Sequence, residues 1–152
     1  MGTEIERKFL VAGDQWREAD ATYYCQGYLN RDQNRTVRVR VAGDQAWLTV
    51  KSLTTNMTRA EFEYLVPLED ARQMLQLCEL PPIEKRRRVI EFAGMSWEVD
   101  EFLGENEGLV VAEIELQSET QPFEVPDWVG EEVTDDPRYF NSRLSVDPYK
   151  TW

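Results

Sequence analysis

Residues 36–41 read TVRVRV, in which valine and arginine alternate without a break. Successive side chains of a β-strand point to opposite faces, so Arg38 and Arg40 share one face and the valines share the other. A Gly-Asp pair then predicts a tight turn into a second strand at 46–51, AWLTVK, which forms a hairpin with the first. The fold therefore contains a strand pair with one apolar face and one charged face.

Most of the chain repeats this alternation in stretches of strand length. EIERKF near the start, RAEFEY, WEVDEF and AEIEL all place charged residues at alternate positions. Short polar or glycine-containing breaks separate them, as is typical of antiparallel strands joined by hairpins. Strands are expected at residues 3–11, 25–29, 36–41, 46–51, 59–66, 84–92, 96–102 and 110–117, with a polar loop at 13–24.

Two segments follow a different pattern. From Glu69 to Cys78 the apolar residues have helical spacing, and a pair of prolines ends the predicted helix. A short helix is expected near the C-terminus, with Asp136 as N-cap and Pro137 at its first position. About eight antiparallel strands can close into a barrel. We therefore expect an α+β, mainly β, fold: a single domain over residues 1–152 that forms an eight-stranded antiparallel β-barrel.

The composition excludes several classes of function. The formal net charge is −12, from 29 acidic and 17 basic residues, which argues against binding to nucleic acid or an anionic membrane. The chain has no histidine, so a metal site would need carboxylate ligands, which favour Mg²⁺ or Mn²⁺. Cys25 and Cys78 have no metal-binding spacing, and neither a signal peptide nor a membrane span is visible, so we expect a cytoplasmic location.

The charged strand faces allow two interpretations. A solvated sheet face with weak cross-strand ion pairs would explain any one strand. Its recurrence on six strands favours a barrel whose charged face points into a tunnel and whose apolar face is covered by helices packed outside. Basic side chains bind phosphate oxygens, and carboxylates hold divalent cations, so this lumen suits a metal-bound polyphosphate. The acids are Glu4, Glu6, Glu61, Glu63, Glu98, Asp100, Glu113 and Glu115, and the bases are Lys8, Arg38, Arg40, Lys51, Arg59, Lys85 and Arg87.

These stretches resemble a known family. EIERKF looks like the Glu-x-Glu-x-Lys signature of the CYTH superfamily, the triphosphate tunnel metalloenzymes. The resemblance continues through QGYL, TVRVRV, LTVKS, RAEFEY, EKRRRV, WEVDEF, AEIEL and the C-terminal PDWVGEEVTDDPRYFNSRLS, and so covers essentially the whole chain. It implies a tunnel-forming barrel and Mg²⁺- or Mn²⁺-dependent chemistry on a triphosphate. Short bacterial members are associated with hydrolysis of inorganic tripolyphosphate to diphosphate and phosphate.

The resemblance also implies roles for single residues. Glu4 or Glu6 would orient or deprotonate the attacking water, and Lys85 would stabilise the leaving diphosphate. Glu98 matches the family pattern less firmly and is expected only to line the lumen. Phosphate contacts are implied for Lys8, Arg38, Arg40, Lys51, Lys85 and Arg87, with Arg59 in second rank; metal contacts are implied for Glu4, Glu6, Glu61, Glu63, Asp100, Glu113 and Glu115.

Some alternatives remain open at the level of sequence. A nucleoside or thiamine triphosphatase, a class IV adenylate cyclase and a non-catalytic polyphosphate binder are the other functions of this scaffold. A homodimer is compatible with the sequence. Tyr28 is expected either at the tunnel mouth or as a core or surface residue, and Arg7 against an acidic helix outside the barrel. Arg138 could reach a phosphate, but a surface ion pair is the preferred interpretation.

Overall fold

The predicted hairpin forms part of a closed ring of strands in the computed structural model, which describes residues 2–152. Among these residues there are nine strands, two α-helices and four short 3₁₀ turns. The strands are β1 Gly2–Val11, β2 Ala21–Asn30, β3 Arg35–Ala42, β4 Gln45–Ser52, β5 Thr58–Val66, β6 Ile83–Phe92, β7 Met95–Phe102, β8 Val110–Glu115 and β9 Val129–Glu132. The helices are α1 Leu68–Leu77 and α2 Asn141–Leu144.

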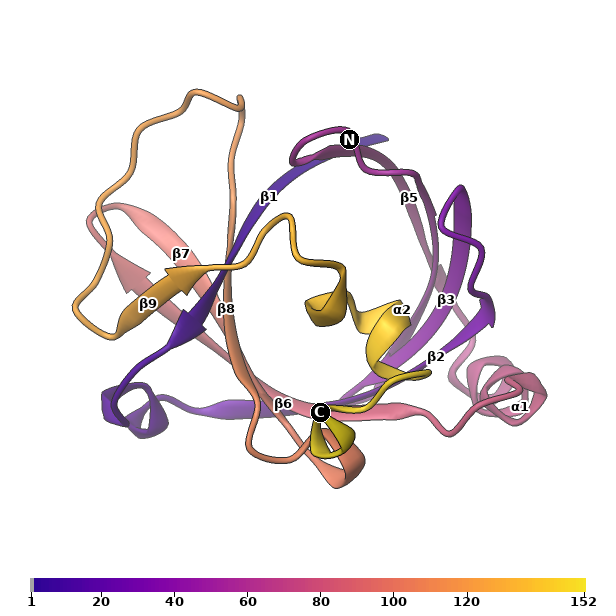
Figure 1. The fold of residues 1–152 in the computed structure, drawn as a ribbon. Helices are drawn as coiled ribbons and strands as arrows, with labels where there is room; N and C mark the ends of the chain where they lie inside the picture. The colour runs from indigo at the N-terminus through magenta and orange to yellow at the C-terminus, as the bar shows by residue number, and fades with distance from the viewer. Residues whose placement is uncertain (1) are drawn as a thin grey trace.

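Eight strands close into an antiparallel barrel. Their order is β5-β4-β3-β2-β6-β7-β8-β1, and β1 closes the ring by pairing with β5, for example Glu4 opposite Arg59. Figure 1 looks down this ring. The ninth strand, β9, pairs with the far end of β1, where Val11 lies opposite Val129. The predicted eight-stranded barrel is therefore confirmed, with one additional strand at its side.

One predicted boundary is wrong. The polar loop expected at 13–24 ends early, because β2 already begins at Ala21 and continues to Asn30. Ala21 pairs with Arg88 of β6, and the register continues from there to Gln26. Cross-strand pairing with β6 thus extends a strand whose first residues have no clear alternation of their own.

The outer face of the barrel is covered in two different ways. The helix α1 packs on β2, β3 and β4, where Val39, Ala46 and Ala71 are buried together. On the opposite side, β9 and the segment before it cover β1, β7 and β8 (Figure 1). The buried cluster there includes Phe9, Trp97 and Trp128, and burial of such large rings contributes much of the hydrophobic stabilisation.

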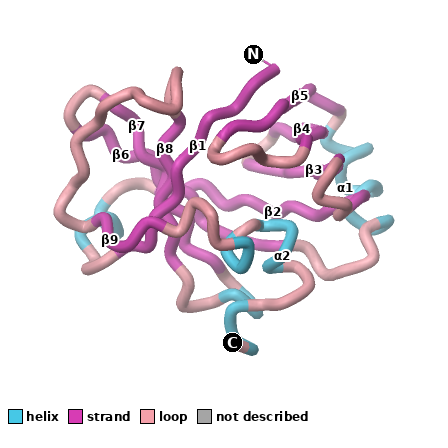
Figure 2. The backbone as a smooth tube through the Cα atoms, turned by 45° about the horizontal axis from the view of Figure 1, so that its top comes forward, coloured by secondary structure: helices cyan, strands magenta, loops and turns pink. Residues whose placement is uncertain are grey.

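The second helix corrects the expectation that helices pack outside. The helix α2 lies across one end of the ring, and a view turned by 45° places it in front of β2 (Figures 1 and 2). Leu144 of α2 and Tyr139 just before it are buried against Ile83 and Phe102 of the barrel. These barrel residues form an apolar end of the lumen, and Tyr139 and Leu144 pack into it. We call the segment from Thr134 to Leu144 the closing segment.

The cap predicted for the C-terminal turn is present. Asp136 accepts a hydrogen bond from the backbone N–H of Arg138, and Pro137 occupies the first position of the 3₁₀ turn Pro137–Tyr139. The α2 helix follows directly after this turn. No helix within residues 2–152 is long and apolar enough to cross a membrane.

Candidate active site

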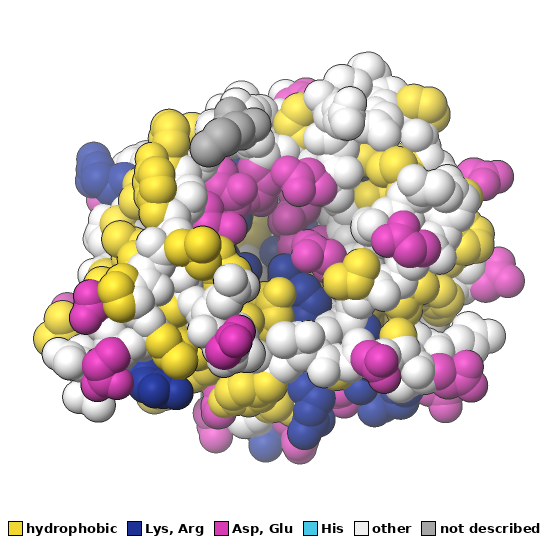
Figure 3. All heavy atoms as spheres, turned by 180° about the vertical axis from the view of Figure 1, so that it is seen from behind, with side chains coloured by type: hydrophobic (Ala, Val, Ile, Leu, Met, Phe, Trp, Pro, Cys, Tyr) yellow, Lys and Arg dark blue, Asp and Glu magenta, His cyan; other side chains and the backbone are white. Residues whose placement is uncertain are grey.

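A cavity of about 210 Å³ occupies the lumen of the barrel. Figure 3 shows its open mouth, with carboxylates around the hollow and basic side chains deeper inside. Every predicted site residue except Asp100 lines it: Glu4, Glu6, Lys8, Arg38, Arg40, Lys51, Arg59, Lys85, Arg87, Glu61, Glu63, Glu113 and Glu115. Glu98, which was expected only to line the lumen, does so. Strand alternation and barrel closure together gather these side chains from seven strands.

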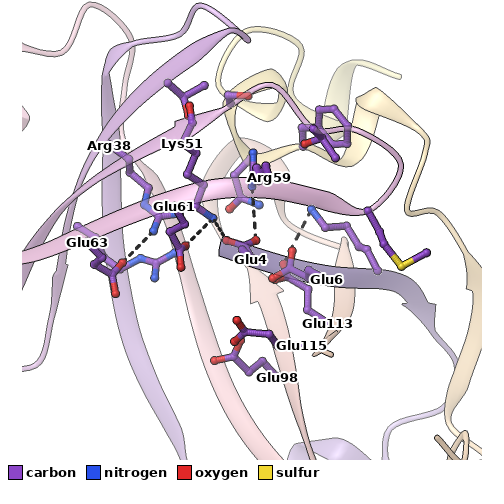
Figure 4. A pocket seen from close by; sticks show the side chains of 18 of the residues that line it. Glu4, Glu6, Arg38, Lys51, Arg59, Glu61, Glu63, Glu98, Glu113 and Glu115 are labelled. Carbon is purple, nitrogen blue, oxygen red and sulfur yellow. Dashed lines mark hydrogen bonds and ion pairs between the residues drawn. The ribbon is translucent and has the colours of Figure 1, made fainter. Parts of the chain in front are cut away.

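Ion pairs between β1, β4 and β5 form the first cluster. Lys51 Nζ lies 2.8 Å from Glu4 Oε2 and 3.2 Å from Glu61 Oε2, and Arg59 Nη2 lies 3.8 Å from Glu4 Oε1 (Figure 4). Burial opposes the charge on Glu4, but Lys51 and Glu61 outweigh it and lower its pKa. Burial and the contact with Glu4 raise the pKa of Glu61 to about 7. The two carboxyls thus share one lysine, and only one of them is readily ionised.

Four carboxyls from β1, β7 and β8 form the second cluster. Glu6 lies beside Glu113, while Glu98 and Glu115 lie beneath them in Figure 4. Burial and the nearby charges of Glu113 and Glu4 raise the pKa of Glu6 well above its ordinary value. Burial opposes ionisation of Glu113 too, but Lys8 and Arg87 outweigh it and lower its pKa. Carboxylates held this close repel one another, so each disfavours ionisation of its neighbour. A cation between them would favour the ionised forms instead.

Asp100 lies behind the cavity wall. It is 0% exposed, and its Oδ2 accepts from Lys85 Nζ at 2.7 Å. Arg87 donates to both oxygens, from Nε to Oδ1 at 2.7 Å and from Nη2 to Oδ2 at 2.9 Å. Burial raises the pKa of Asp100, but Arg87 and Lys85 reverse this and hold it at about 2. Its oxygens are occupied by two cations that themselves line the cavity, so Asp100 fixes where those cations stand.

The basic side chains crowd together at the deeper end. Burial, with Arg38 and Arg87 nearby, lowers the pKa of Arg40 to about 10. Burial also lowers the pKa of Lys85 to about 7, although Asp100 opposes the shift. Within residues 2–152, Arg38 Nε is a buried donor that has no hydrogen-bond partner. This concentration of cations, with one donor unpaired, is the electrostatic setting that a polyanion would stabilise.

The closing segment contributes neutral polar groups that the sequence argument missed. Asn141 Oδ1 accepts from Lys85 Nζ at 3.1 Å and from Gln26 Nε2 at 2.9 Å. Lys8 Nζ donates to the backbone oxygen of Tyr139 at 3.1 Å. Gln26 shares the inward face of β2 with Tyr28, so strand alternation could have identified it; Asn141 follows an irregular segment that carries no such signal.

The structure also places the three residues whose position was open. Tyr28 lines the cavity, opposite Arg38 in the strand register. Arg7 pairs through two nitrogens with Glu132 at 2.6 and 2.8 Å, so its partner is in strand β9 and the predicted acidic helix was wrong. Arg138 forms the expected surface ion pair, with Asp136 at 2.7 Å.

The chemistry of the cavity follows from its lining. Carboxylate oxygens are the ligands that hard divalent cations prefer, and Glu6 with Glu113 shows carboxyls brought close enough to compete for a proton. No three carboxyls of the described chain are yet gathered closely enough to hold a metal ion, because several pair with lysine or arginine instead. The carboxylate oxygens of the lining are nevertheless the kind of donor that a hard divalent cation takes.

Comparisons with known proteins agree with this geometry. A family model described as the CYTH domain matches residues 2–146. An inorganic triphosphatase of Acetivibrio thermocellus is 53% identical over 154 residues, which cover 100% of this chain and 99% of that protein. An inorganic triphosphatase of Nitrosomonas europaea is 36% identical over 148 residues, which cover 95% of this chain and 97% of that protein.

Solved structures share the barrel. The crystal structure of an inorganic triphosphatase superposes with a TM-score of 0.68 at 34% identity, and the match covers 93% of this chain and 97% of that one. A Hippeastrum protein described as having a dominant triphosphatase activity superposes with a TM-score of 0.58 at 14% identity, covering 76% of this chain and 80% of that one. At that low identity the second likeness concerns the fold alone.

Proposed function

The chain belongs to the CYTH domain family, and we propose that it is an inorganic triphosphatase that hydrolyses tripolyphosphate to diphosphate and phosphate. The observation that carries the proposal is the single lumen cavity in which lysines and arginines meet carboxylates. Two curated relatives, 53% and 36% identical, are inorganic triphosphatases, which makes this chain a hydrolase of phosphoric anhydrides. A tripolyphosphate is a chain of charged groups without an organic part, and the cavity lining is correspondingly charged.

The basic residues would bind the phosphate oxygens. Arg38, with its unpaired Nε, offers a buried donor, and Lys85 and Arg87 are held in place from behind by Asp100. Because arginine donates through several N–H groups in a fixed plane, it binds phosphate in bidentate fashion. The full proposed set is Lys8, Arg38, Arg40, Lys51, Arg59, Lys85 and Arg87.

The family implies a divalent metal, and we propose Mg²⁺ or Mn²⁺, because the cavity offers carboxylate oxygens and no histidine. The proposed ligands are Glu4, Glu6, Glu61, Glu63, Glu113 and Glu115, all of which line the cavity. The family resemblance also implies Asp100 as a metal ligand. Because Lys85 and Arg87 occupy its oxygens, we assign Asp100 the task of positioning those two cations instead.

The proposed reaction is attack of a water oxygen on a terminal phosphorus. The bridging P–O bond breaks, diphosphate leaves with the bond electrons, and the water gives up its proton to a carboxylate, Glu4 or Glu6. Lys85 would stabilise the charge of the leaving diphosphate. A divalent cation held by the proposed carboxylate ligands would supply positive charge that offsets the charge of the phosphate oxygens. Phosphoryl transfer depends mainly on such positioning and neutralisation, which a preformed lumen provides.

The proposal also covers the cellular location of the protein, its oligomeric state and the competing functions. The chain has two free cysteines, which suits the reducing conditions of a cytoplasmic location. The homodimer stays a prediction. Hydrolysis of nucleoside or thiamine triphosphate, cyclisation of ATP and binding without turnover are the competing functions.

Product analysis by ³¹P NMR tests the proposal. With Mg²⁺ or Mn²⁺, each tripolyphosphate should give one phosphate and one diphosphate, and the Glu6→Gln variant should leave tripolyphosphate largely intact. Formation of cyclic AMP and diphosphate from ATP would instead identify a cyclase. Tight binding of tripolyphosphate without any new phosphorus signal would identify a binding protein and contradict the proposal.

A further inference from the structure

Asn141 stands where the closing segment meets the deep end of the cavity. It is the first residue of α2 and lines the lumen together with Phe140 and Ser142. Its side-chain oxygen accepts from two donors at once, Lys85 Nζ at 3.1 Å and Gln26 Nε2 at 2.9 Å. Both donors belong to barrel strands, Gln26 to β2 and Lys85 to β6. The Asn141 amide therefore joins the closing segment to the barrel wall.

These two donors determine which way the Asn141 amide faces. A lysine ammonium can only donate, so the amide atom beside Lys85 must be the oxygen. Gln26 is fixed in the same sense, because its own Oε1 accepts from Arg40 Nε at 2.8 Å and its Nε2 is left to donate. The network from Arg40 through Gln26 to Asn141 and Lys85 therefore has one self-consistent arrangement of donors and acceptors.

The nitrogen of the Asn141 amide is left over. Within residues 2–152 it has no hydrogen-bond partner, whereas its oxygen has two. Among those residues, the side-chain atoms that are both buried and unpaired are Arg38 Nε and Trp97 Nε1. Asn141 Nδ2 is not one of them, and Asn141 is among the residues that line the cavity. An amide N–H₂ held in a fixed direction in a cation-rich cavity is a ready donor for a phosphate oxygen.

We propose that Asn141 is a substrate-binding residue whose Nδ2 donates to the terminal phosphate of a triphosphate at the closed end of the lumen. This inference rests on the proposed function, because it takes tripolyphosphate as the ligand. A terminal phosphate has three peripheral oxygens and so accepts more hydrogen bonds than a bridging one. Lys85 and Lys8 serve it as charged donors, and Asn141 adds a neutral donor whose direction is fixed by Gln26.

Two substitutions separate this role from simple packing. Asn141→Asp keeps the volume of the side chain and an oxygen for Lys85 and Gln26, but replaces the N–H₂ donor by a charge that repels phosphate. Asn141→Ala removes both the donor and the acceptor. Arg143→Ala is the matched control, because Arg143 lies in the same short helix and is exposed. Thermal unfolding of each variant shows whether the closing segment stays in place.

Calorimetric titration with inorganic tripolyphosphate is the test, first without divalent metal and then with Mg²⁺ in the Glu6→Gln background, which should not hydrolyse the ligand. A hydrogen bond to a charged group is worth enough that both Asn141 variants should bind about tenfold more weakly or worse. The Asp variant should be affected at least as much as the Ala variant, and Arg143→Ala should match the wild type. Binding by Asn141→Asp within twofold of the wild type would overturn the inference.

The same titration separates this inference from the proposed function. Wild-type protein that binds tripolyphosphate but does not hydrolyse it contradicts the triphosphatase proposal, while the Asn141 comparison still decides the present one. If the wild type hydrolyses tripolyphosphate but the Asn141 variants bind it as tightly as the wild type does, only the proposed role of Asn141 is overturned. Absence of tripolyphosphate binding under both conditions overturns both proposals.

Discussion

Arg87 and Asp100 lie directly opposite each other on neighbouring strands β6 and β7, and the guanidinium donates to both carboxylate oxygens, at 2.7 and 2.9 Å. Lys85 adds a third donor to the same carboxylate at 2.7 Å. The carboxylate is wholly buried, and the lysine is 1% exposed. One buried acidic residue thus compensates two cations; Arg87 also pairs with Glu98 at 3.0 Å.

Asp100→Asn should therefore destabilise the fold strongly. Removing one partner of a buried ion pair leaves uncompensated charge, at a cost of about 3–5 kcal/mol. Chemical denaturation should show this loss in the free energy of unfolding. Asp136→Asn, which breaks the exposed pair with Arg138, serves as control and should leave the free energy of unfolding nearly unchanged. Equal effects of the two substitutions would show that Asp100 does not carry this role.

Glu6→Gln should separate activity from stability. The substitution removes a carboxylate proposed for metal and water, so turnover of tripolyphosphate should fall by about 100-fold or more. It also removes a charge that Glu113 and Glu4 disfavour, so the melting temperature should stay the same or rise. Glu69→Gln on the exposed face of α1 is the control and should change neither quantity. Unchanged turnover in Glu6→Gln would refute the proposed site.

Gly27 allows α1 to pack closely on the barrel. A Cβ at this position would lie 2.8 Å from Cys78 Sγ and 3.4 Å from Leu75 Cδ2, so Gly27→Ala forces the end of the helix outward. Overpacking of this kind typically costs about 1–3 kcal/mol. Because Cys78→Ala removes the sulfur atom, the Gly27→Ala cost should be smaller in that background. A double-mutant cycle on the free energy of unfolding measures this coupling, and strict additivity would contradict the proposed contact.

The pair of Arg7 and Glu132 gives a prediction about pH. Hydrogen bonding from Arg7, opposed in part by burial, lowers the pKa of Glu132. A carboxyl whose folded-state pKa is depressed stabilises the fold above its unfolded pKa, and this contribution is lost as the pH falls through the folded value. The pair is partly exposed, so the contribution should stay below about 1 kcal/mol.

Carboxyl ¹³C NMR titration should find the pKa of Glu132 below its ordinary value in the wild type and higher in Arg7→Gln, where Thr134 still donates to the carboxylate. A pKa of Glu132 that does not respond to the removal of Arg7 would contradict the assignment.

The sequence could predict the barrel because its signal is repeated. Alternation places Glu4 and Glu6 on one face of β1 and Arg38 and Arg40 on one face of β3, and the structure turns all four into the lumen. Closure depends on a pairing between strands distant in sequence, because β1 pairs with β8 on one side and with β5 on the other. Asp100 shows the limit of the argument. Strand alternation correctly predicts that its side chain points inward. Whether the carboxylate reaches the cavity or stays buried behind Lys85 and Arg87 depends on how neighbouring strands are arranged in the barrel, which the sequence of one strand does not show.

The closing segment could not be predicted for a different physical reason. Tyr139 ends a 3₁₀ turn and Asn141 begins the short helix α2, and both elements are too short for a periodic pattern to show which side is buried. Their position is set by Leu144 and Tyr139 packing into the apolar end of the barrel, against residues distant in sequence. Neutral residues such as Gln26 were also not predicted, because the alternating pattern that indicates the lumen consists of charged residues.

The most direct test of the central claim is the initial rate of phosphate release from tripolyphosphate and from ATP, measured side by side with Mg²⁺ and with Mn²⁺. Thiamine triphosphate serves as a third substrate, and Glu6→Gln as the inactive reference. The account predicts a higher kcat/KM for tripolyphosphate than for either organic triphosphate. Faster turnover of ATP or thiamine triphosphate, or no metal-dependent phosphate release from tripolyphosphate, would contradict it.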